Sequence, residues 1–181
     1  MHLKAILKSN NGVSMIMLVI TIIMMAVIVS FAVFSSKNIT PESKLAAAYS
    51  SLKTVKDACD NALNLIEINP NEYDEYYFFG QNVQNLLSES ELQSILTDCG
   101  LGVSPDPNTV ISSRSYLIKS SKDSETSQRM LERLELKGVT STYLVDLENE
   151  KYYIVNGVER VDGEEVYEYK DVLRAYNMLT D

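Results

Sequence analysis

The sequence predicts an α+β fold in which a long helix packs on a small antiparallel β-sheet. Two observations lead to this prediction. Apolar residues recur at helical spacing through residues 42–68, which is typical of an amphipathic helix. Residues 142–169 contain short, partly alternating apolar segments divided by turn signals, which is typical of a β-meander. A third feature, the uncharged apolar segment Val13–Phe34, precedes both and is the candidate membrane anchor of the domain.

The segment Val13–Phe34 is long enough to cross a membrane as a helix. At ~1.5 Å per residue it spans ~33 Å, against a hydrocarbon core of ~30 Å. Lys4 and Lys8 precede it, whereas every Asp and Glu follows it. This distribution favours a cytoplasmic N-terminus and an external C-terminal domain. We therefore expect a single-pass membrane protein whose residues 42–181 form one external domain.

Residues 35–41 form a short polar joint, after which a helix begins with Thr40 as N-cap and Pro41 at the first helical position. The apolar stripe of this helix is too short to be typical of a coiled coil, so we expect it to cover the core of its own domain rather than to form a filament contact. The helix ends at Asn69-Pro70-Asn71. The residues of the stripe are Leu45, Ala48, Leu52, Val55, Cys59, Ala62 and Ile66.

Shorter helices and strands are predicted in the middle of the chain. Residues 72–79 are aromatic and acidic, and such a cluster more often packs on a sheet than binds a partner. A helix is expected over Ser88–Asp98, because Ser88 and Glu91 form a capping-box pattern. Further along we expect a loop over 102–109, a strand over 114–119 and a helix over 123–136 that Lys137-Gly138 terminates.

The C-terminal part predicts the sheet. The segments TYLVDL, KYYIV, VERV and EVYEY read as three or four strands, and Asn156-Gly157 and Asp162-Gly163 are both type I′ turn signals. A final helix is expected over about 170–179.

The residues just before the apolar segment carry a family resemblance. Lys8-Ser9-Asn10-Asn11-Gly12 is followed at once by hydrophobic residues. This resembles the class III signal of type IV prepilins and pseudopilins, and the apolar run is similar to prepilin-like proteins of Gram-positive-type bacteria. The resemblance implies cleavage after Gly12 by a prepilin peptidase and methylation of the new terminus at Val13. It also implies a pilin-like globular domain, with the helix over 42–68 as the outer half of a long N-terminal helix.

The sequence departs from the family at two positions. The fifth residue after the cut, usually glutamate, is Met17, and the first is Val13 rather than an aromatic residue. In the family that glutamate pairs with the N-terminal amine of a neighbouring subunit, and a buried ammonium without a partner is costly. The resemblance therefore implies a minor pilin or pseudopilin. Its partners would be other pilin-like subunits, through the Val13–Phe34 helix, together with the prepilin peptidase and the pilus or secretion assembly machinery.

Two other interpretations of the N-terminus remain open. Val13–Phe34 would be a permanent anchor if the leader is never cut, and the chain would then be a cell-surface binding module that uses the Tyr73–Phe79 region. Alternatively, Ser30-Phe31-Ala32 is a small-x-small cleavage candidate of an ordinary secretory signal. The mature N-terminus distinguishes these interpretations, since each leaves a different first residue.

Composition excludes several classes of function. The formal net charge is −9, and the residues after Phe34 carry 14 basic against 25 acidic side chains, which disfavours nucleic acids. The only histidine is His2, in the leader, so Ser-His and Cys-His catalytic schemes are excluded. No nucleotide-binding or zinc-protease motif appears, and we expect no enzyme, no metal and no cofactor.

Two groups of residues leave alternatives open. Asp146, Glu148 and Glu150 have a spacing that would suit Ca²⁺, but they straddle an expected turn, so solvated turn residues are the favoured interpretation. Cys59 and Cys99 would form a disulfide outside the cell, or else remain buried free thiols, Cys59 lying on the apolar stripe.

Overall fold

A computed structural model describes Met25, residues 40–120 and residues 125–180. The chain divides into two units, Met1–Thr40 and Pro41–Asp181, and the fold described below is that of the second. The leader and the predicted membrane helix Val13–Phe34 lie outside the described residues, apart from Met25. Among the residues that are described, no helix has both the length and the hydropathy needed to cross a membrane.

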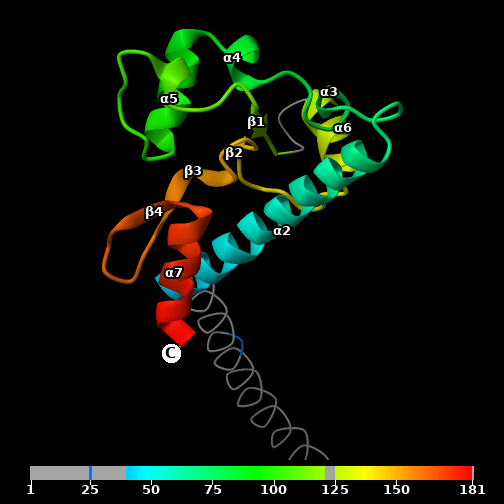
Figure 1. Cartoon of the computed structure of the whole chain (residues 1–181). Helices are drawn as coiled ribbons and strands as arrows, with labels where there is room; N and C mark the ends of the chain where they lie inside the picture. Colours follow the sequence, from blue (N-terminus) through cyan, green and yellow to red (C-terminus); the bar gives the residue numbers. More distant parts are fainter. Residues whose placement is uncertain (1–24, 26–39, 121–124, 181) are drawn as a thin grey trace, which may run out of the picture. The chain divides into compact units, whose positions relative to one another are not determined.

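The second unit is α+β, as predicted, with a four-stranded antiparallel sheet in the described part of the chain (Figure 1). Its strands follow the order β1-β2-β3-β4, so each strand pairs with the next along the chain. The strands are β1 (Ser115–Ile118), β2 (Tyr143–Asp146), β3 (Lys151–Glu159) and β4 (Glu165–Glu168). The helices are α2 (Pro41–Ile68), α3 (Glu75–Phe79), α4 (Val83–Leu86), α5 (Glu89–Asp98), α6 (Glu125–Arg133) and α7 (Tyr169–Thr180), with a 3₁₀ turn at Pro107–Thr109.

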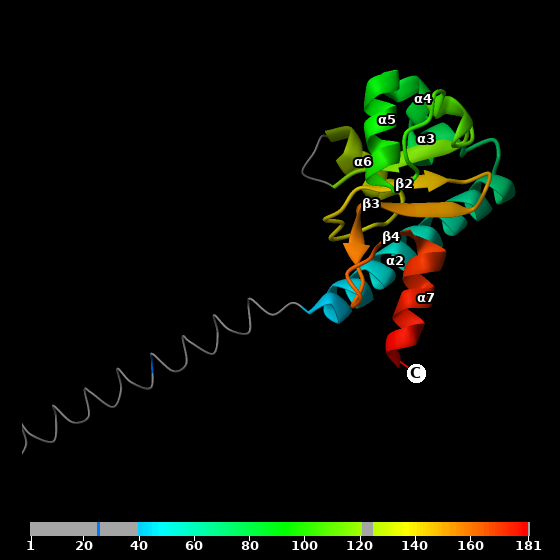
Figure 2. The same cartoon turned by 90° about the vertical axis from the view of Figure 1, so that its left-hand side faces the viewer.

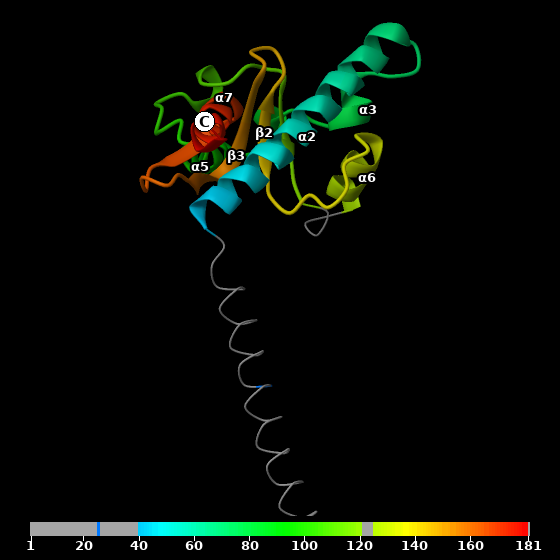
Figure 3. The ribbon, with the colours of Figure 1, turned by 90° about the horizontal axis from the view of Figure 1, so that it is seen from below.

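Helix α2 covers one face of the sheet, as the apolar stripe predicts (Figure 3). Six of the seven stripe residues are buried, and Ile66 is partly buried against the same core. Pro41 begins the helix and Ile68 ends it, in agreement with the predicted bounds. Helices α3, α6 and α7 contribute side chains to this same core, among them Phe79, Leu131 and Val172.

A second helical layer covers the opposite face of the sheet (Figure 2). Side chains alternate along a strand, so Leu117 and Leu144 point away from α2 and pack with Leu92 and Leu96 of α5. The capping box predicted for this helix is present: the Ser88 hydroxyl accepts a hydrogen bond from the Glu91 N–H, and Glu91 accepts one from the Ser88 N–H. The sequence predicted α5 but not that it covers the second face of the sheet. Because both faces are covered, β1 and β2 are buried on both sides.

Two predicted boundaries are wrong. Asn156-Gly157 is not a hairpin turn but a bulge within β3, where both residues have positive φ (70° and 60°) and the register with β4 shifts. KYYIV and the first two residues of VERV are therefore one strand, and the turn before β4 is at Asp162-Gly163. The helix expected over 123–136 ends at Arg133, because Glu135 is left-handed (φ 55°) and the Leu136 N–H donates to the Leu131 carbonyl at 2.8 Å.

The ring of Tyr167 on β4 packs against the backbone at two left-handed glycines. A Cβ at Gly157 would lie 2.6 Å from Tyr167 Cε1, and one at Gly100 would lie 2.6 Å from Cδ2. Gly100 follows α5 and Gly157 is in the β3 bulge. Because neither glycine has a side chain, the ring of Tyr167 packs against both the end of α5 and the bulge in β3, and so connects them.

We predict that Gly157→Ala destabilises the domain more than Gly163→Ala. Both substitutions place alanine at positive φ, which costs ~1–2 kcal/mol, but Gly163 has nothing within 4 Å of its added Cβ. Overpacking against Tyr167 should add ~1–3 kcal/mol at Gly157 only. Urea unfolding of the full chain in detergent, followed by tyrosine near-UV circular dichroism, measures the difference. A Tyr167→Ala background should remove the additional cost, and equal costs of the two glycine variants in the wild-type background would contradict the assignment.

Candidate interaction surface

The aromatic segment predicted over residues 72–79 divides between the core and the surface. Asp74 is the N-cap of α3, and its carboxylate accepts a hydrogen bond from the Tyr77 N–H at 2.6 Å. The turn buries Phe78 and Phe79 while leaving Tyr76 and Tyr77 exposed by 65% and 38%. The expectation that the cluster packs on the sheet therefore holds for the phenylalanines, whereas these two tyrosines face outward.

Helix α3 is fixed to strand β1 by Glu75. Its carboxylate accepts hydrogen bonds from Arg114 Nε at 2.8 Å, from Arg114 Nη2 and from the Tyr116 hydroxyl at 2.6 Å. Burial alone would raise the pKa of Glu75, but these donors outweigh it and hold the pKa below its ordinary value. For Tyr116, burial first and Glu75 second raise the pKa of the phenol.

Arg133, the last residue of α6, holds Tyr77, one of the two exposed tyrosines. Its Nη1 donates to the Tyr77 carbonyl at 2.6 Å, and its guanidinium lies 4.5 Å from the centroid of the Tyr77 ring. A cation over a ring face is attracted by the quadrupole of the ring. Tyr77 is thus held between the buried Phe78, on one side, and Arg133, on the other.

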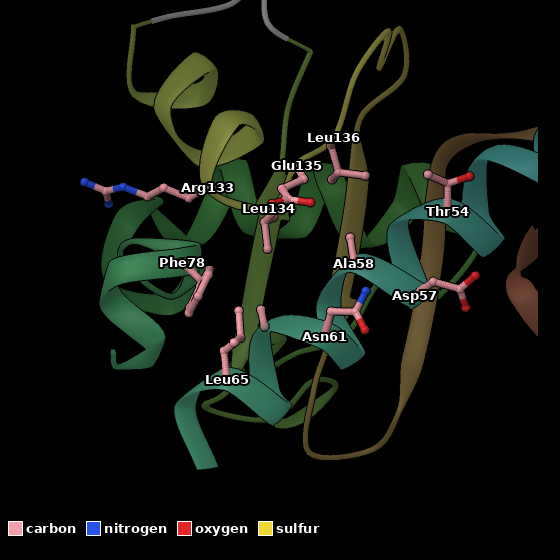
Figure 4. Close-up of a pocket in the computed structure, with 11 residues that line it drawn as sticks. Thr54, Asp57, Ala58, Asn61, Leu65, Phe78, Arg133, Leu134, Glu135 and Leu136 are labelled. Atoms are coloured by element: carbon pink, nitrogen blue, oxygen red, sulfur yellow. The ribbon is translucent and has the colours of Figure 1, made fainter. Parts of the chain in front are cut away.

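A groove of about 340 Å³ runs beside this surface (Figure 4). One wall is the C-terminal half of α2, the other is Arg133 at the end of α6 with residues 134–136 that follow it, and Phe78 lies between them. The lining mixes apolar residues such as Leu65 and Leu136 with Asp57 and Glu135. The groove therefore presents both apolar and acidic groups beside the aromatic surface.

A second apolar surface lies around the opposite end of α2, which we call the α7 hollow. It encloses about 290 Å³ and is lined by residues of α2, α7 and the β3–β4 hairpin. Three of its apolar side chains are strongly exposed: Val161 (57%), Met178 (65%) and Leu179 (39%). The residues that line it are Leu45, Arg160, Val161, Asp162, Ala175, Met178 and Leu179.

The expectation of a solvated turn is wrong for Asp146. This carboxylate is 1% exposed and accepts hydrogen bonds from the Ser112 hydroxyl at 2.6 Å and from the Asn149 side chain at 2.8 Å, among others. Burial would raise its pKa, but these donors lower it. Glu148 and Glu150 are exposed, as expected. Within the described ranges, no three His, Cys, Asp or Glu side chains are grouped to hold a metal ion.

The two cysteines are free thiols in two different cores. Cys59 on α2 packs in the core below the sheet, and Cys99 after α5 packs in the core on its other face. Because the sheet separates them, the disulfide left open by the sequence is not formed, and the alternative of buried thiols describes both residues. Burial raises the pKa of both, that of Cys99 to about 12.

The residues predicted for processing lie outside the described part of the chain: Gly12, Val13 and Met17. Within it, sequence reasoning found Tyr73–Phe79 but missed Arg133 and the α7 hollow. Arg133 is 56 residues from Tyr77, and the hollow joins residues of three elements, so no local pattern indicated either.

Comparison with protein-family models, with curated proteins and with solved structures gives no match for this chain.

We predict that the domain loses stability in acid through Glu75 and Asp146. The pKa of each carboxyl group is lower in the folded state than in the unfolded state. The stabilisation that each carboxylate contributes to the fold is therefore complete above the unfolded pKa values of ~4.3 and ~3.9, and it is lost as the pH falls below these. The urea midpoint of the full chain in detergent should stay level from pH 7 to about 5 and fall steeply below about 4. Glu75→Gln should lower the midpoint at pH 7 and flatten the acid limb, whereas Glu67→Gln, on the exposed side of α2, should do neither. A wild-type midpoint that does not fall in acid would contradict this.

We predict that the intact mass of the folded chain does not change on reduction and that neither thiol reacts with iodoacetamide until the domain is unfolded. Burial keeps both sulfurs protonated and inaccessible. Mass spectrometry of the full chain before and after urea should show zero and then two carbamidomethyl groups, since the sequence contains two cysteines. A gain of two mass units on reduction would instead show a bridge.

Proposed function

We propose that the chain is a type IV pilin-like structural subunit, and a minor pilin or pseudopilin rather than a major one. It would be processed after Gly12, methylated at Val13 and retained by the Val13–Phe34 helix. The observation that carries the proposal is the immediate succession of a hydrophilic leader, a glycine and an uncharged apolar run. A cut on the inner side removes Lys4 and Lys8 but leaves the apolar helix attached, whereas a secretory cut removes the anchor.

The fold of the second unit supports the proposal. Helix α2 begins at Pro41, seven residues after Phe34, and continues for 28 residues along an antiparallel sheet. A long helix laid on a small sheet, following an apolar segment in the sequence, is the arrangement that the resemblance implies. The domain would lie outside the cell, on a single-pass anchor whose N-terminus starts in the cytoplasm.

Met17 supports a minor role. A methylated amine at Val13 stays positively charged, and Met17 has no carboxylate to pair with it in an apolar filament interior. A subunit at a filament end has fewer neighbours around its terminus than one in the middle. The partners of the chain are then other pilin-like subunits, the prepilin peptidase and the assembly machinery, and we propose no catalytic activity and no cofactor.

The second candidate function is a permanently anchored binding module. It is favoured by the exposed rings of Tyr76 and Tyr77, of which Tyr77 is held by Arg133, beside the groove of Figure 4. Aromatic side chains that are held rigidly in this way are typical of binding surfaces.

The mature N-terminus tests the proposal. The full chain, produced in membranes with a prepilin peptidase, should begin at N-methylated Val13 by intact-mass and terminal-peptide analysis. Gly12→Val should leave the leader attached, because a branched side chain obstructs the backbone at the cut, while Asn10→Ala should be processed normally. Molecules that retain Lys4 and Lys8 would identify the anchored module, and molecules that begin after Ala32 would identify a secreted protein.

A further inference from the structure

The α7 hollow lies at the end of α2 that follows the apolar N-terminal segment in the chain. Pro41 begins α2, and Leu45, one turn later, lines the hollow. The last turns of α7 and the β3–β4 hairpin lie at the same end of the second unit (Figures 1 and 2). Because α2 has 28 residues it is ~42 Å long, so Ile68, its last residue, is far from the hollow.

The chain between the apolar segment and α2 is short. Phe34 and Pro41 are seven residues apart, and seven residues span at most ~25 Å even when fully extended. With Val13–Phe34 in the membrane, as proposed above, this length limits how far the first turn of α2 can be from the lipid surface. A short tether raises the effective concentration of the domain at that surface, so a contact too weak for free molecules is populated.

We propose that the α7 hollow is a lipid-contact surface, through which the domain rests on the phospholipid surface of the membrane that holds its anchor. The proposal rests on the Val13–Phe34 anchor, which both candidate functions share. It goes beyond them because neither gives the hollow a role. The contact belongs to the chain while its apolar segment is in the membrane, before any assembly into a filament.

The exposed side chains of the hollow suit the boundary between headgroups and acyl chains. Val161 (57% exposed) comes from the hairpin, and Met178 (65%) and Leu179 (39%) come from α7, around one hollow of about 290 Å³. Large apolar side chains that gather on a surface in this way mark a contact site. They leave water when they enter the headgroup boundary, which is the driving force for a domain to lie on a membrane.

Three tyrosines lie beside the hollow. Tyr176 follows Ala175, which lines it, and the Tyr176 ring stacks on Tyr49 of α2 with centroids 4.7 Å apart. Tyr49 also stacks on Tyr169, at 6.0 Å. All three side chains are partly exposed. Tyrosines of this kind are typical of the membrane interface, because the ring is apolar while the hydroxyl stays hydrated.

The basic groups beside the hollow are already paired within the domain. Arg160 lies 2.8 Å from Asp162 and 3.2 Å from Glu164. Lys44 of α2 lies 3.9 Å from Glu159. We therefore expect burial of apolar side chains, rather than attraction of these two cations to anionic headgroups, to make the contact. Phosphatidylcholine, which has no net charge, should be sufficient.

Quenching by labelled lipids tests the contact in the full chain. Met178→Cys and Ile68→Cys each provide an exposed thiol for the fluorophore NBD, whereas the native Cys59 and Cys99 are buried and stay unlabelled. The vesicles are phosphatidylcholine with a nitroxide near the headgroup, present in both leaflets, so the direction of insertion does not matter. The label at position 178 should be quenched about fivefold more than the label at position 68.

A substitution in the hairpin connects the quenching with the hollow. Val161→Asp places a charge in the apolar surface, and in the labelled Met178→Cys chain it should at least halve the quenching. The matched control is Val103→Asp, at a loop position that is 83% exposed, and it should leave the quenching unchanged. Because both positions are exposed, the urea midpoint of each variant should equal that of its parent.

Three outcomes would overturn the proposal: equal quenching of the two labels, quenching that requires anionic lipid, or quenching that depends on the number of copies per vesicle. The last would identify a second copy as the occupant of the hollow. Processing to Val13 without the difference in quenching removes the lipid contact alone, and the difference on molecules that retain their leader removes the filament function alone. Chains that do not float with the vesicles would remove the anchor and the lipid contact together.

Discussion

The structure depends on the contact between the apolar stripe of α2 and one face of the sheet. Leu52, Val55 and Cys59 are all at most 1% exposed, and they pack in the same core as Tyr143 and Tyr152 of the central strands. The polar end of Tyr152 is satisfied at this contact, because its hydroxyl donates to Asp60 at 3.2 Å. With α2 fixed by this face, α7 packs beside its first half, where Tyr49 stacks on Tyr169 and Tyr176. Phe78 of α3 lines the same groove as Leu65 toward the other end of α2, so the two exposed surfaces lie toward opposite ends of the helix.

Patterns that are local in sequence predicted the elements well. Pro41, the Asn69-Pro70 stop and the Ser88–Glu91 capping box fix helix ends through contacts of three or four residues, and the structure contains all three signals at the expected places. Asn156-Gly157 shows the limit of such patterns. The dipeptide does adopt the positive φ values that its composition favours, but tertiary contact with Tyr167 places it inside a strand. The preference of Asn156-Gly157 for positive φ is local, but the contact with Tyr167, ten residues from Gly157, makes the dipeptide a bulge rather than a turn.

The surface could be predicted only in part. The acidic aromatic segment drew attention to Tyr76 and Tyr77, yet composition alone did not separate them from the buried Phe78 and Phe79. That separation follows from the Asp74 cap and from the Glu75 contacts with Arg114 and Tyr116, 39 and 41 residues away. Asp146 is similar: its partner Ser112 is 34 residues away, so a position that read as a solvated turn is a buried acceptor. Whether Cys59 and Cys99 pair could not be predicted from the sequence, because the answer depends on which face of the sheet each helix covers.

The two proposed functions are compatible at the end of a filament. In the proposed filament the charged Val13 amine lacks its carboxylate partner, because residue 17 is methionine, and this is least costly where fewer apolar neighbours surround it. A subunit in such a terminal place would present Tyr76, Tyr77 and Arg133 to the surroundings. The aromatic surface would then be a binding surface at the filament end, on a subunit that is itself held by its apolar helix.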